Sequence, residues 1–544
     1  MATIVNQRLA SLRSLVVDDM APVRQNIRTQ LGQLGIAHVD QAATPDEAIG
    51  AIRRQSYDII VCDYNLNRET NGQQVLEYVR SQGILSPASM FIMVTAESSY
   101  DFVASAAEFQ PDAYMIKPLT GAKLLERIER LLDRQAALRP IAGRLALKDL
   151  PGAVAECDVA IQAQPKWALD IMKLKANALL DLGRPDEARA VYQKVLKVRD
   201  DIVWARLGLA RCHQMAGELD AARKVAAEVL ELNPRYVMAY DLLARVAETE
   251  GKEAEALEAL NRSCEVVPSA RRSRMVGDVA YRTGNLDQAK EAFSRALQQT
   301  RGSVTAQPGD LLTLAQVHVD TGDAKAALDL LGGAPKHYAD APQFVATRAA
   351  VQAQAHVSLG DEKAAQAAFE AAREAAGAIE GGRDDAAALA LAKAAFSLGR
   401  EEEGAELLAK AVMADHENPR LVSLAKKVLR DSGKEELAAS IVDQAQKRVE
   451  AIVAEAGALM RQARFDESLV RLEEALQSMP DNTGVLLAAA QLHLLWMSQK
   501  GINLDYVARV NHYLSRLDVL IPGNERVTKM YRFMRETLSR APKA

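Results

Sequence analysis

The chain has 544 residues and a formal net charge of −5, and 49% of its residues are apolar although only 5% are aromatic. This length exceeds one hydrophobic core, so we expect several domains or a repeat array. Acidic and basic residues are interspersed, which gives no general electrostatic reason to expect binding to nucleic acid or a membrane. Four cysteines without a CxxC pair, and no apolar signal segment near the N-terminus, predict buried thiols and a cytoplasmic location.

After an extension over residues 1–11, residues 12–133 alternate short apolar runs with amphipathic segments. This pattern predicts strands at 14–17, 38–40, 58–62, 90–94 and 113–116, and helices at 21–34, 45–55, 72–81, 98–109 and 120–138. Strands that alternate with helices predict an α/β domain with a doubly wound parallel sheet. Ligands of such folds bind at the carboxyl ends of the strands.

Polar residues follow these strands at their carboxyl ends. Asp18 and Asp19 follow the first strand, Asp63 the third, Thr95 the fourth and Lys117 the fifth. Carboxylates at one edge repel one another unless a divalent cation lies between them, and Mg²⁺ accepts such oxygen ligands. A lysine and a hydroxyl donor complete a set that suits a phosphoryl group carried by Asp63.

These residues resemble the receiver domain of bacterial two-component response regulators, over residues 12 to about 135. The matching motifs are Val16-Val17-Asp18-Asp19, Asp63, Thr95-Ala96 and Tyr114-Met115-Ile116-Lys117-Pro118. The resemblance implies a flavodoxin-like fold in which Asp63 accepts a phosphoryl group from a sensor histidine kinase or a phosphotransfer protein. Apart from this phosphotransfer and its reversal by dephosphorylation, we expect no enzymatic activity.

The same resemblance implies a Mg²⁺ site. Asp19 would bind the ion directly and Asp18 through water, while Asp63 and the backbone carbonyl of Asn65 would complete the ligands from the chain. An alternative is a degenerate receiver that keeps the fold without the chemistry, although every acidic, hydroxyl and lysine position is filled.

A switch is implied as well. Thr95 and Lys117 would hold the phosphoryl oxygens, and Tyr114 would turn inward when the threonine is drawn to the phosphate. The Lys117–Pro118 peptide bond is expected to be cis, the usual reason for a proline at such a corner.

Beyond residue 133 the sequence is periodic. A series of glycines recurs, and small residues stand at fixed positions before and after each of them. Each glycine would permit a tight turn between two antiparallel helices, and the small residues would let those helices cross closely. The pattern resembles the tetratricopeptide repeat and predicts an all-α superhelix of about ten repeats over 134–482, with an irregular helical cap over 483–544. The glycines, spaced by 33 to 39 residues, are Gly183, Gly217, Gly251, Gly284, Gly322, Gly360, Gly399 and Gly433, and Ala463 takes the same place in a weaker copy.

Stacked helix pairs offer an inner face that binds segments of other proteins. We therefore expect an adaptor whose array binds a protein partner in a way that depends on phosphorylation of Asp63. The predicted helix from Thr120 leads almost directly into the first repeat, and the face of the fourth helix, fifth strand and fifth helix would contact the array or a second receiver in a homodimer. Two alternatives are a constitutive assembly scaffold, whose receiver serves for docking or dimerisation, and a phosphate sink for a histidine kinase.

Overall fold

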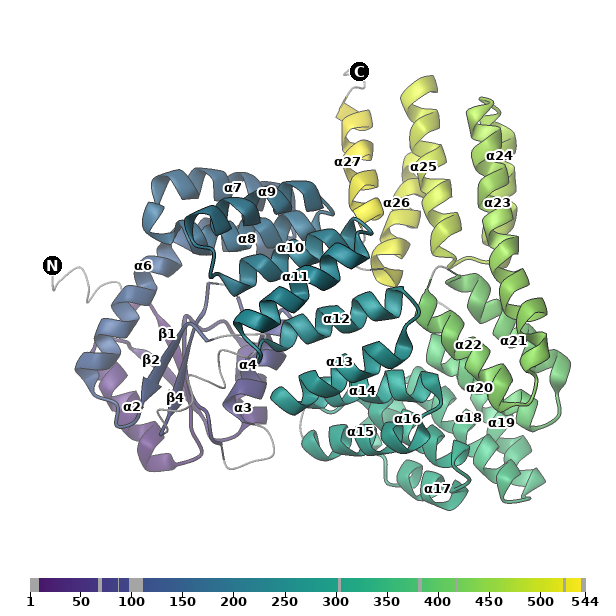
Figure 1. Ribbon diagram of the computed structural model, residues 1–544, viewed down its shortest axis with the longest axis horizontal. Helices are drawn as coiled ribbons and strands as arrows, with labels where there is room; N and C mark the ends of the chain where they lie inside the picture. The colour runs from purple at the N-terminus through teal and green to yellow at the C-terminus, as the bar shows by residue number, and fades with distance from the viewer. Residues whose placement is uncertain are drawn as a thin grey trace. The chain divides into compact units, whose positions relative to one another are not determined.

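In the computed structural model the chain forms two compact units, residues 1–279 with 294–307 and residues 280–293 with 308–544 (Figure 1). The structure describes residues 9–66, 71–86, 88–96, 111–301, 305–379, 384–416, 418–521 and 525–539. The helix expected over 98–109 lies outside these residues. Within the described ranges, no helix has both the length and the apolar character that a membrane crossing requires.

The first unit begins with a five-stranded parallel sheet in the order β2-β1-β3-β4-β5, which confirms the predicted doubly wound fold. Its strands are β1 (Arg13–Val17), β2 (His38–Ala42), β3 (Ile59–Asp63), β4 (Met90–Thr95) and β5 (Ala113–Ile116). The register pairs Val17 with Cys62, Asp63 with Val94 and Thr95 with Ile116. The carboxyl ends of β1, β3, β4 and β5 are therefore level.

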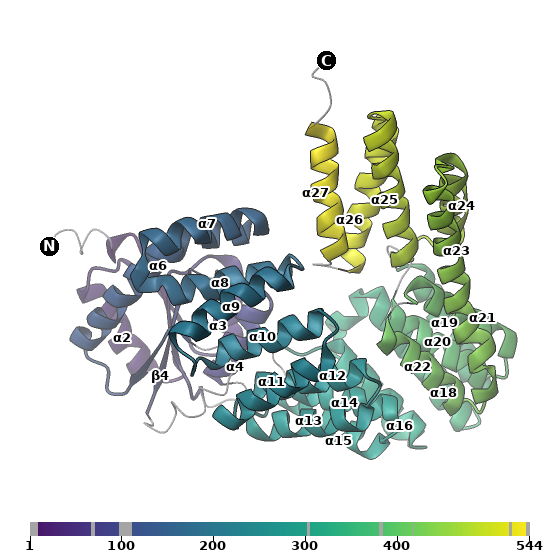
Figure 2. The ribbon, with the colours of Figure 1, turned by 45° about the horizontal axis from the view of Figure 1, so that its top comes forward.

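Helices cover both faces of this sheet, which explains why its inner strands are apolar without alternation. The helices α3 (Pro45–Arg54) and α4 (Gly72–Ser81) pack on one face, and α2 (Ala21–Gln33) and α6 (Gly121–Ala146) pack on the other (Figures 1 and 2). The last of these helices continues beyond the sheet, so it connects the sheet domain to the helical array.

Two groups of buried residues on α6 pack on different partners. Leu124 and Ile128 lie in the core of the sheet domain, whereas Leu138 and Ile141 pack with residues of the next helices, such as Ile171. The helix runs through Pro140 instead of ending there, because its last turns bury apolar surface that offsets the ~3 kcal/mol cost of an internal proline. The predicted boundary between residues 133 and 134 falls inside this helix.

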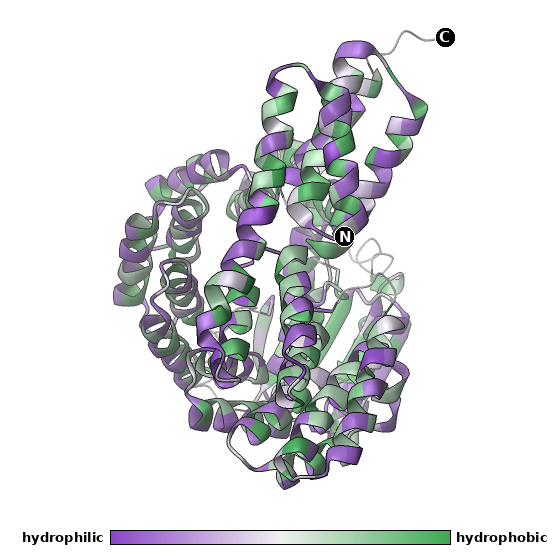
Figure 3. Cartoon of the chain, turned by 90° about the vertical axis from the view of Figure 1, so that its right-hand side faces the viewer, coloured by the Kyte–Doolittle hydropathy of each residue, from purple (hydrophilic) through white to green (hydrophobic). Residues whose placement is uncertain are grey.

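Antiparallel helix pairs make up the rest of the chain. Figure 3 shows hydrophobic and hydrophilic residues interspersed along the helices in view, as expected of amphipathic helices. Their bounds are α7 Leu150–Ala163, α8 Ala168–Asp181, α9 Pro185–Val198, α10 Val203–Met215, α11 Leu219–Leu232, α12 Val237–Thr249, α13 Glu253–Val266, α14 Ala270–Thr283, α15 Leu286–Gln299, α16 Pro308–Asp320, α17 Ala324–Gly332, α18 Pro342–Ser358, α19 Glu362–Gly377, α20 Asp385–Ser397, α21 Glu401–Ala414, α22 Pro419–Asp431, α23 Gln444–Arg461, α24 Phe465–Ser478, α25 Thr483–Lys500, α26 Leu504–Leu520 and α27 Glu525–Ser539.

The repeat glycines form the turns that their spacing predicts. All eight have a positive φ, between 62° and 84°, a conformation that costs glycine almost nothing. Lys148 and Ala463 take the same conformation at φ 54° and 59°. The turn geometry of the array therefore persists where the glycine is missing, at the cost of backbone strain.

Close helix crossings explain the small residues of the period. Tyr192 on α9 is almost fully buried, and its ring lies where a Cβ atom on Gly208 of α10 would have to be. Phe369 on α19 packs in the same way against Ala349, Ala350 and Ala353 of α18. Each aromatic ring thus fills the space that the small residues leave.

Candidate functional site

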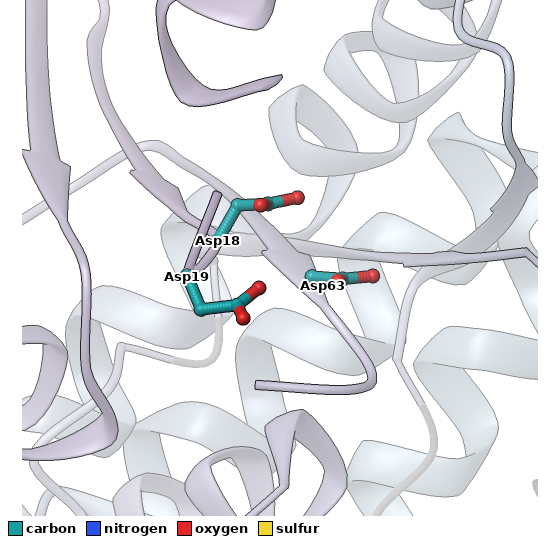
Figure 4. A group of neighbouring side chains, drawn as sticks. All are labelled: Asp18, Asp19 and Asp63. Atoms are coloured by element: carbon teal, nitrogen blue, oxygen red, sulfur yellow. The ribbon is translucent and has the colours of Figure 1, made fainter. Parts of the chain in front are cut away.

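Three carboxylates meet at the carboxyl ends of β1 and β3. Oxygen atoms of Asp18, Asp19 and Asp63 all lie within 4.8 Å of one another, and Figure 4 shows the three carboxylates directed to the same side. Asp18 is fully buried and Asp63 is 7% exposed. The strand register, which places Val17 beside Cys62, brings together residues that are distant in sequence.

Lys117 completes this cluster from the end of β5. Its Nζ atom lies 2.9 Å from Asp18 Oδ2 and 3.0 Å from Asp63 Oδ2. The Lys117 backbone N–H donates to the carbonyl of Thr95 at 2.8 Å, and the peptide bond to Pro118 is cis as expected. One ammonium group therefore bridges two of the three carboxylates.

The loop after β1 is held by contacts that the sequence did not suggest. The backbone N–H of Met20 donates to Asp18 Oδ1 at 2.9 Å. The guanidinium of Arg24 donates to the carbonyls of Asp18 and Asp19 at 2.6 and 3.0 Å. Arg24 lies in the first turn of α2, where an arginine resembles any solvated helix residue, so only its position shortly after Asp18-Asp19 could have pointed to this role.

Backbone hydrogen bonds hold Tyr64, directly after β3, to both β4 and the start of α4. Tyr64 N–H donates to the Val94 carbonyl, and Gly72 N–H donates to the Tyr64 carbonyl, both at 2.8 Å. A Cβ atom on Gly72 would overlap the carbonyl oxygen of Asp63, a constraint that the sequence reasoning missed. Asn65 is exposed directly after this strand, and residues 67–70 lie outside the described residues. The metal contact from its carbonyl remains a prediction.

Burial dominates the electrostatics of the cluster. It raises the pKa of Asp63, although the hydrogen bond and the charge of Lys117 counteract part of the rise. Burial also lowers the pKa of Lys117, but its hydrogen bonds to Asp18 and Asp63 outweigh this effect and leave the pKa above its usual value. Lys117 therefore stays protonated, and an ionised Asp63 is costly without further positive charge.

The predicted switch residues lie beside this cluster. Thr95 ends β4 and is 6% exposed, and its carbonyl already holds the backbone of Lys117. Tyr114 is partly buried, with its side chain against the core formed by α3 and α4. Thr95 pairs with Ile116, the residue before Lys117, and Tyr114 lies on the same strand, β5. The motion of Thr95 and Tyr114 on phosphorylation remains a prediction.

The carboxylate set fits a hard divalent cation. Lys117 pairs with Asp18 and Asp63. One ammonium group thus lies beside three carboxylates whose oxygen atoms are within 4.8 Å of one another. Carboxylate oxygens with room for water are the ligands that Mg²⁺ prefers. This charge balance supports the predicted cofactor.

Comparison with known proteins agrees with this geometry. A family model for the response regulator receiver domain matches residues 15–129. The chemotaxis protein CheY of Pseudomonas aeruginosa is 31% identical over 123 residues, which make up 23% of this chain and 98% of that relative. The chain belongs to the response regulator family. Its receiver domain is also similar to chemotaxis protein CheY-3 of Vibrio cholerae, 26% identical over 134 residues, 25% of this chain and 99% of CheY-3.

The helical part of this response regulator matches a second family model. Residues 179–246 match the tetratricopeptide repeat. Among solved structures, Vibrio cholerae chemotaxis protein CheY4 is 24% identical over 22% of this chain and 98% of its own, with a TM-score of 0.20. A thermophilic TPR protein of Thermus thermophilus is 18% identical over 34% and 97% of the two chains, with a TM-score of 0.28. By the two family models, the chain joins a receiver domain to tetratricopeptide repeats.

Proposed function

We propose that this response regulator acts in a phosphorelay, with Asp63 as the phosphoryl acceptor and the tetratricopeptide array as a phosphorylation-dependent binding surface for a protein partner. The observation that supports it most is the bridge from Lys117 to both Asp18 and Asp63 at 2.9 and 3.0 Å. Such a bridge places positive charge where phosphoryl oxygens would lie.

The phosphoryl donor is a phosphohistidine of a sensor histidine kinase or a phosphotransfer protein. An Asp63 carboxylate oxygen attacks the phosphorus atom, and an acyl phosphate bond forms while the phosphorus–nitrogen bond breaks. The leaving nitrogen keeps the electron pair, and the ring retains one proton. Lys117 then exchanges its contact with Asp63 for a phosphoryl oxygen, and the Thr95 hydroxyl donates to another.

Asp18, Asp19 and Asp63, with the Asn65 carbonyl, would hold Mg²⁺. When bound, the ion supplies positive charge against the phosphoryl oxygens. Asp18 is held by Met20 N–H and Lys117, and the Asp18 and Asp19 carbonyls are held by Arg24. These contacts fix the two acids before any ligand arrives, which lowers the cost of ordering the site.

The output depends on a change of charge. Phosphorylation adds about −1.5 to −2 charges at Asp63, which draws Thr95 toward the phosphate and lets Tyr114 turn inward beside Pro118. The helix α6 carries core residues of both the receiver and the first repeat. A shared helix favours coupling over the phosphate-sink alternative, for which the array would be dispensable. We place this activity in the bacterial cytoplasm, where histidine kinases act on receivers.

A pull-down compares the full-length protein with its Asp63→Asn variant, each with and without beryllofluoride and Mg²⁺, and mass spectrometry identifies the partners. We expect at least one partner whose recovery changes with beryllofluoride for the wild type only. Equal recovery in every arm would favour the constitutive scaffold. An Asp186→Asn variant, which alters a highly exposed carboxylate of α9, serves as the control.

A further inference from the structure

The helix α4 begins at the phosphoryl acceptor. Gly72, its first residue, packs on the Asp63 carbonyl so closely that no side chain fits between them. Asn71 caps the helix through a capping box with Gln74, which fixes the start of α4 to the end of the loop. A shift of the Asp63 backbone therefore acts directly on the first residue of α4.

The far end of α4 is tied to the array through a chain of charged side chains. Arg80 contacts Asp112 Oδ2 at 3.3 Å, and Arg134 on α6 contacts Asp112 Oδ1 at 2.6 Å. Arg134 also reaches Asp170 on α8 at 2.9 Å. Asp112 also accepts a hydrogen bond from Phe91 N–H at 2.8 Å. This series of contacts therefore runs from the sheet of the receiver to a repeat helix.

The middle of α4 is covered on the side that turns away from the sheet. Val75, Leu76 and Val79 pack on the sheet, yet Gln73 is only 5% exposed and one carboxylate oxygen of Glu77 is enclosed. Burial raises the pKa of Glu77, and the charges of two array residues, Arg272 and Arg271, counteract part of that rise. Both arginines lie in the first turn of α14, so the positive charges that act on the enclosed side of α4 come from the array.

Arg272 is itself held rigidly. It is 2% exposed, and it donates to Ser263 Oγ at 3.1 Å and to the Val267 carbonyl at 3.4 Å. Asp241 accepts from Ser263 at 2.6 Å and lies 3.9 Å from the guanidinium. The positive charge that faces Glu77 is therefore part of the folded core of the repeats and not a mobile surface group.

We propose that α4 is the surface by which the receiver docks onto its own tetratricopeptide array, with Glu77 against Arg271 and Arg272 and with Arg134 as the bridge at the other end. This dock is the route by which Asp63 acts on the array. It differs from the expected face of the fourth helix (98–109), fifth strand and fifth helix, although it shares with that face Arg134 on α6. The route, unlike the dock, rests on the proposed function. When Asp63 is phosphorylated, the start of α4 shifts with the Asp63 backbone on which Gly72 packs, and the attraction between Glu77 and the two arginines weakens.

The test uses hydrogen–deuterium exchange on the full-length protein, read at residues 72–81 and 270–279. In Glu77→Arg a cation faces two arginines, so exchange at 270–279 should rise by about tenfold or more. Glu129→Arg, at an exposed position of α6, should leave that exchange unchanged. Adding Arg271→Glu to Glu77→Arg should restore protection. Unchanged exchange in Glu77→Arg would overturn the dock, provided that the variant still binds beryllofluoride and so has a folded receiver.

Beryllofluoride with Mg²⁺ tests the route separately. It should raise exchange at 270–279 in the wild type and have little further effect in Glu77→Arg, where the contact is already lost. An equal rise in both proteins would show that coupling runs elsewhere and would overturn the route. If the wild type does not respond, phosphorylation-dependent coupling fails as part of the proposed function, while the charge reversal still decides the dock.

Discussion

Lys393 on α20 donates to both carboxylate oxygens of Asp320 on α16, at 2.8 Å each, across 73 residues of sequence. The two side chains are only 9% and 6% exposed. The Tyr281 hydroxyl from α14 and the Gln316 amide also donate to this carboxylate, at 2.9 and 2.8 Å. Side chains from three helices that are not consecutive, α14, α16 and α20, thus converge on one buried carboxylate.

Removing Lys393 should strongly destabilise this part of the array. Lys393→Met leaves Asp320 buried without its main counter-charge, and breaking such a pair costs about 3–5 kcal/mol. Hydrogen exchange of amides in α16 and α20 measures the loss as a lower free energy of local unfolding. Lys410→Met is the matched control: the side chains of Lys410 and Glu406 are 65% and 66% exposed, so loss of this pair should leave the free energy of local unfolding nearly unchanged. Similar losses in the two variants would contradict the importance of burial.

Asp63→Asn should stabilise the metal-free receiver at neutral pH. The pKa of Asp63 in the folded state lies above the ordinary value of 3.8. As pH rises, the Asp63 carboxyl therefore loses its proton in the unfolded chain before it does so in the folded protein. Between the two pKa values the folded state binds more protons, and stability therefore falls with rising pH. Asparagine removes this effect, and the gain in Tm over the wild type should be largest at pH 7 and vanish as pH falls toward 3.8.

Thermal unfolding in EDTA at several pH values checks this. Asp133→Asn, at a carboxylate that is 56% exposed on α6, should show no such pH-dependent gain. A wild type more stable than Asp63→Asn at pH 7 would mean that Asp63 is stabilised in the apo site.

Gly72→Ala should damage the site from the backbone. Because a Cβ atom would overlap the Asp63 carbonyl, the loop or the strand end must shift, at a cost of about 1–3 kcal/mol. Beryllofluoride binding, followed by titration with Mg²⁺ present, should weaken as well. Gly32→Ala in α2 meets nothing within 4 Å and should be neutral or stabilising by up to about 1 kcal/mol. Equal binding by both variants would exclude a tight contact at Gly72.

Ala463→Gly should stabilise the array. Ala463 has a φ of 59° in the place of a repeat glycine, where a side chain costs about 1–2 kcal/mol, and part of that gain is lost to the greater freedom of glycine in the unfolded chain. A net gain of up to about 1 kcal/mol should appear in urea unfolding. Ala454→Gly, at an exposed position of α23, should lose about 1 kcal/mol. If both substitutions destabilise, the turn is not strained.

The sequence allowed the fold and the cluster of site residues to be predicted for one physical reason. Parallel strands with helical crossovers place their carboxyl ends at one edge, so Asp18, Asp63 and Lys117 had to meet once the strands were recognised. The array glycines were equally visible, because a turn with positive φ selects for glycine.

Other contacts could not be predicted in this way. Arg24 and Gly72 act through backbone carbonyls, which no side-chain pattern reveals. The contact of Lys393 with Asp320 depends on how tightly the helix pairs coil, and the position of Glu77 depends on how α6 orients the receiver. The Lys393–Asp320 contact and the position of Glu77 are both determined by packing over many residues and not by the periodicity of the local sequence.

The most direct test is phosphorylation of the full-length protein by acetyl phosphate, read by mass spectrometry of peptides. With Mg²⁺, the wild type should gain one phosphoryl group, labile to hydroxylamine as an acyl phosphate is, in the peptide that contains Asp63. Asp63→Asn, and the wild type in EDTA, should gain none. A wild type that stays unmodified with Mg²⁺, or an Asp63→Asn variant that is modified to the same extent, would contradict the assignment of Asp63 as the phosphoryl acceptor.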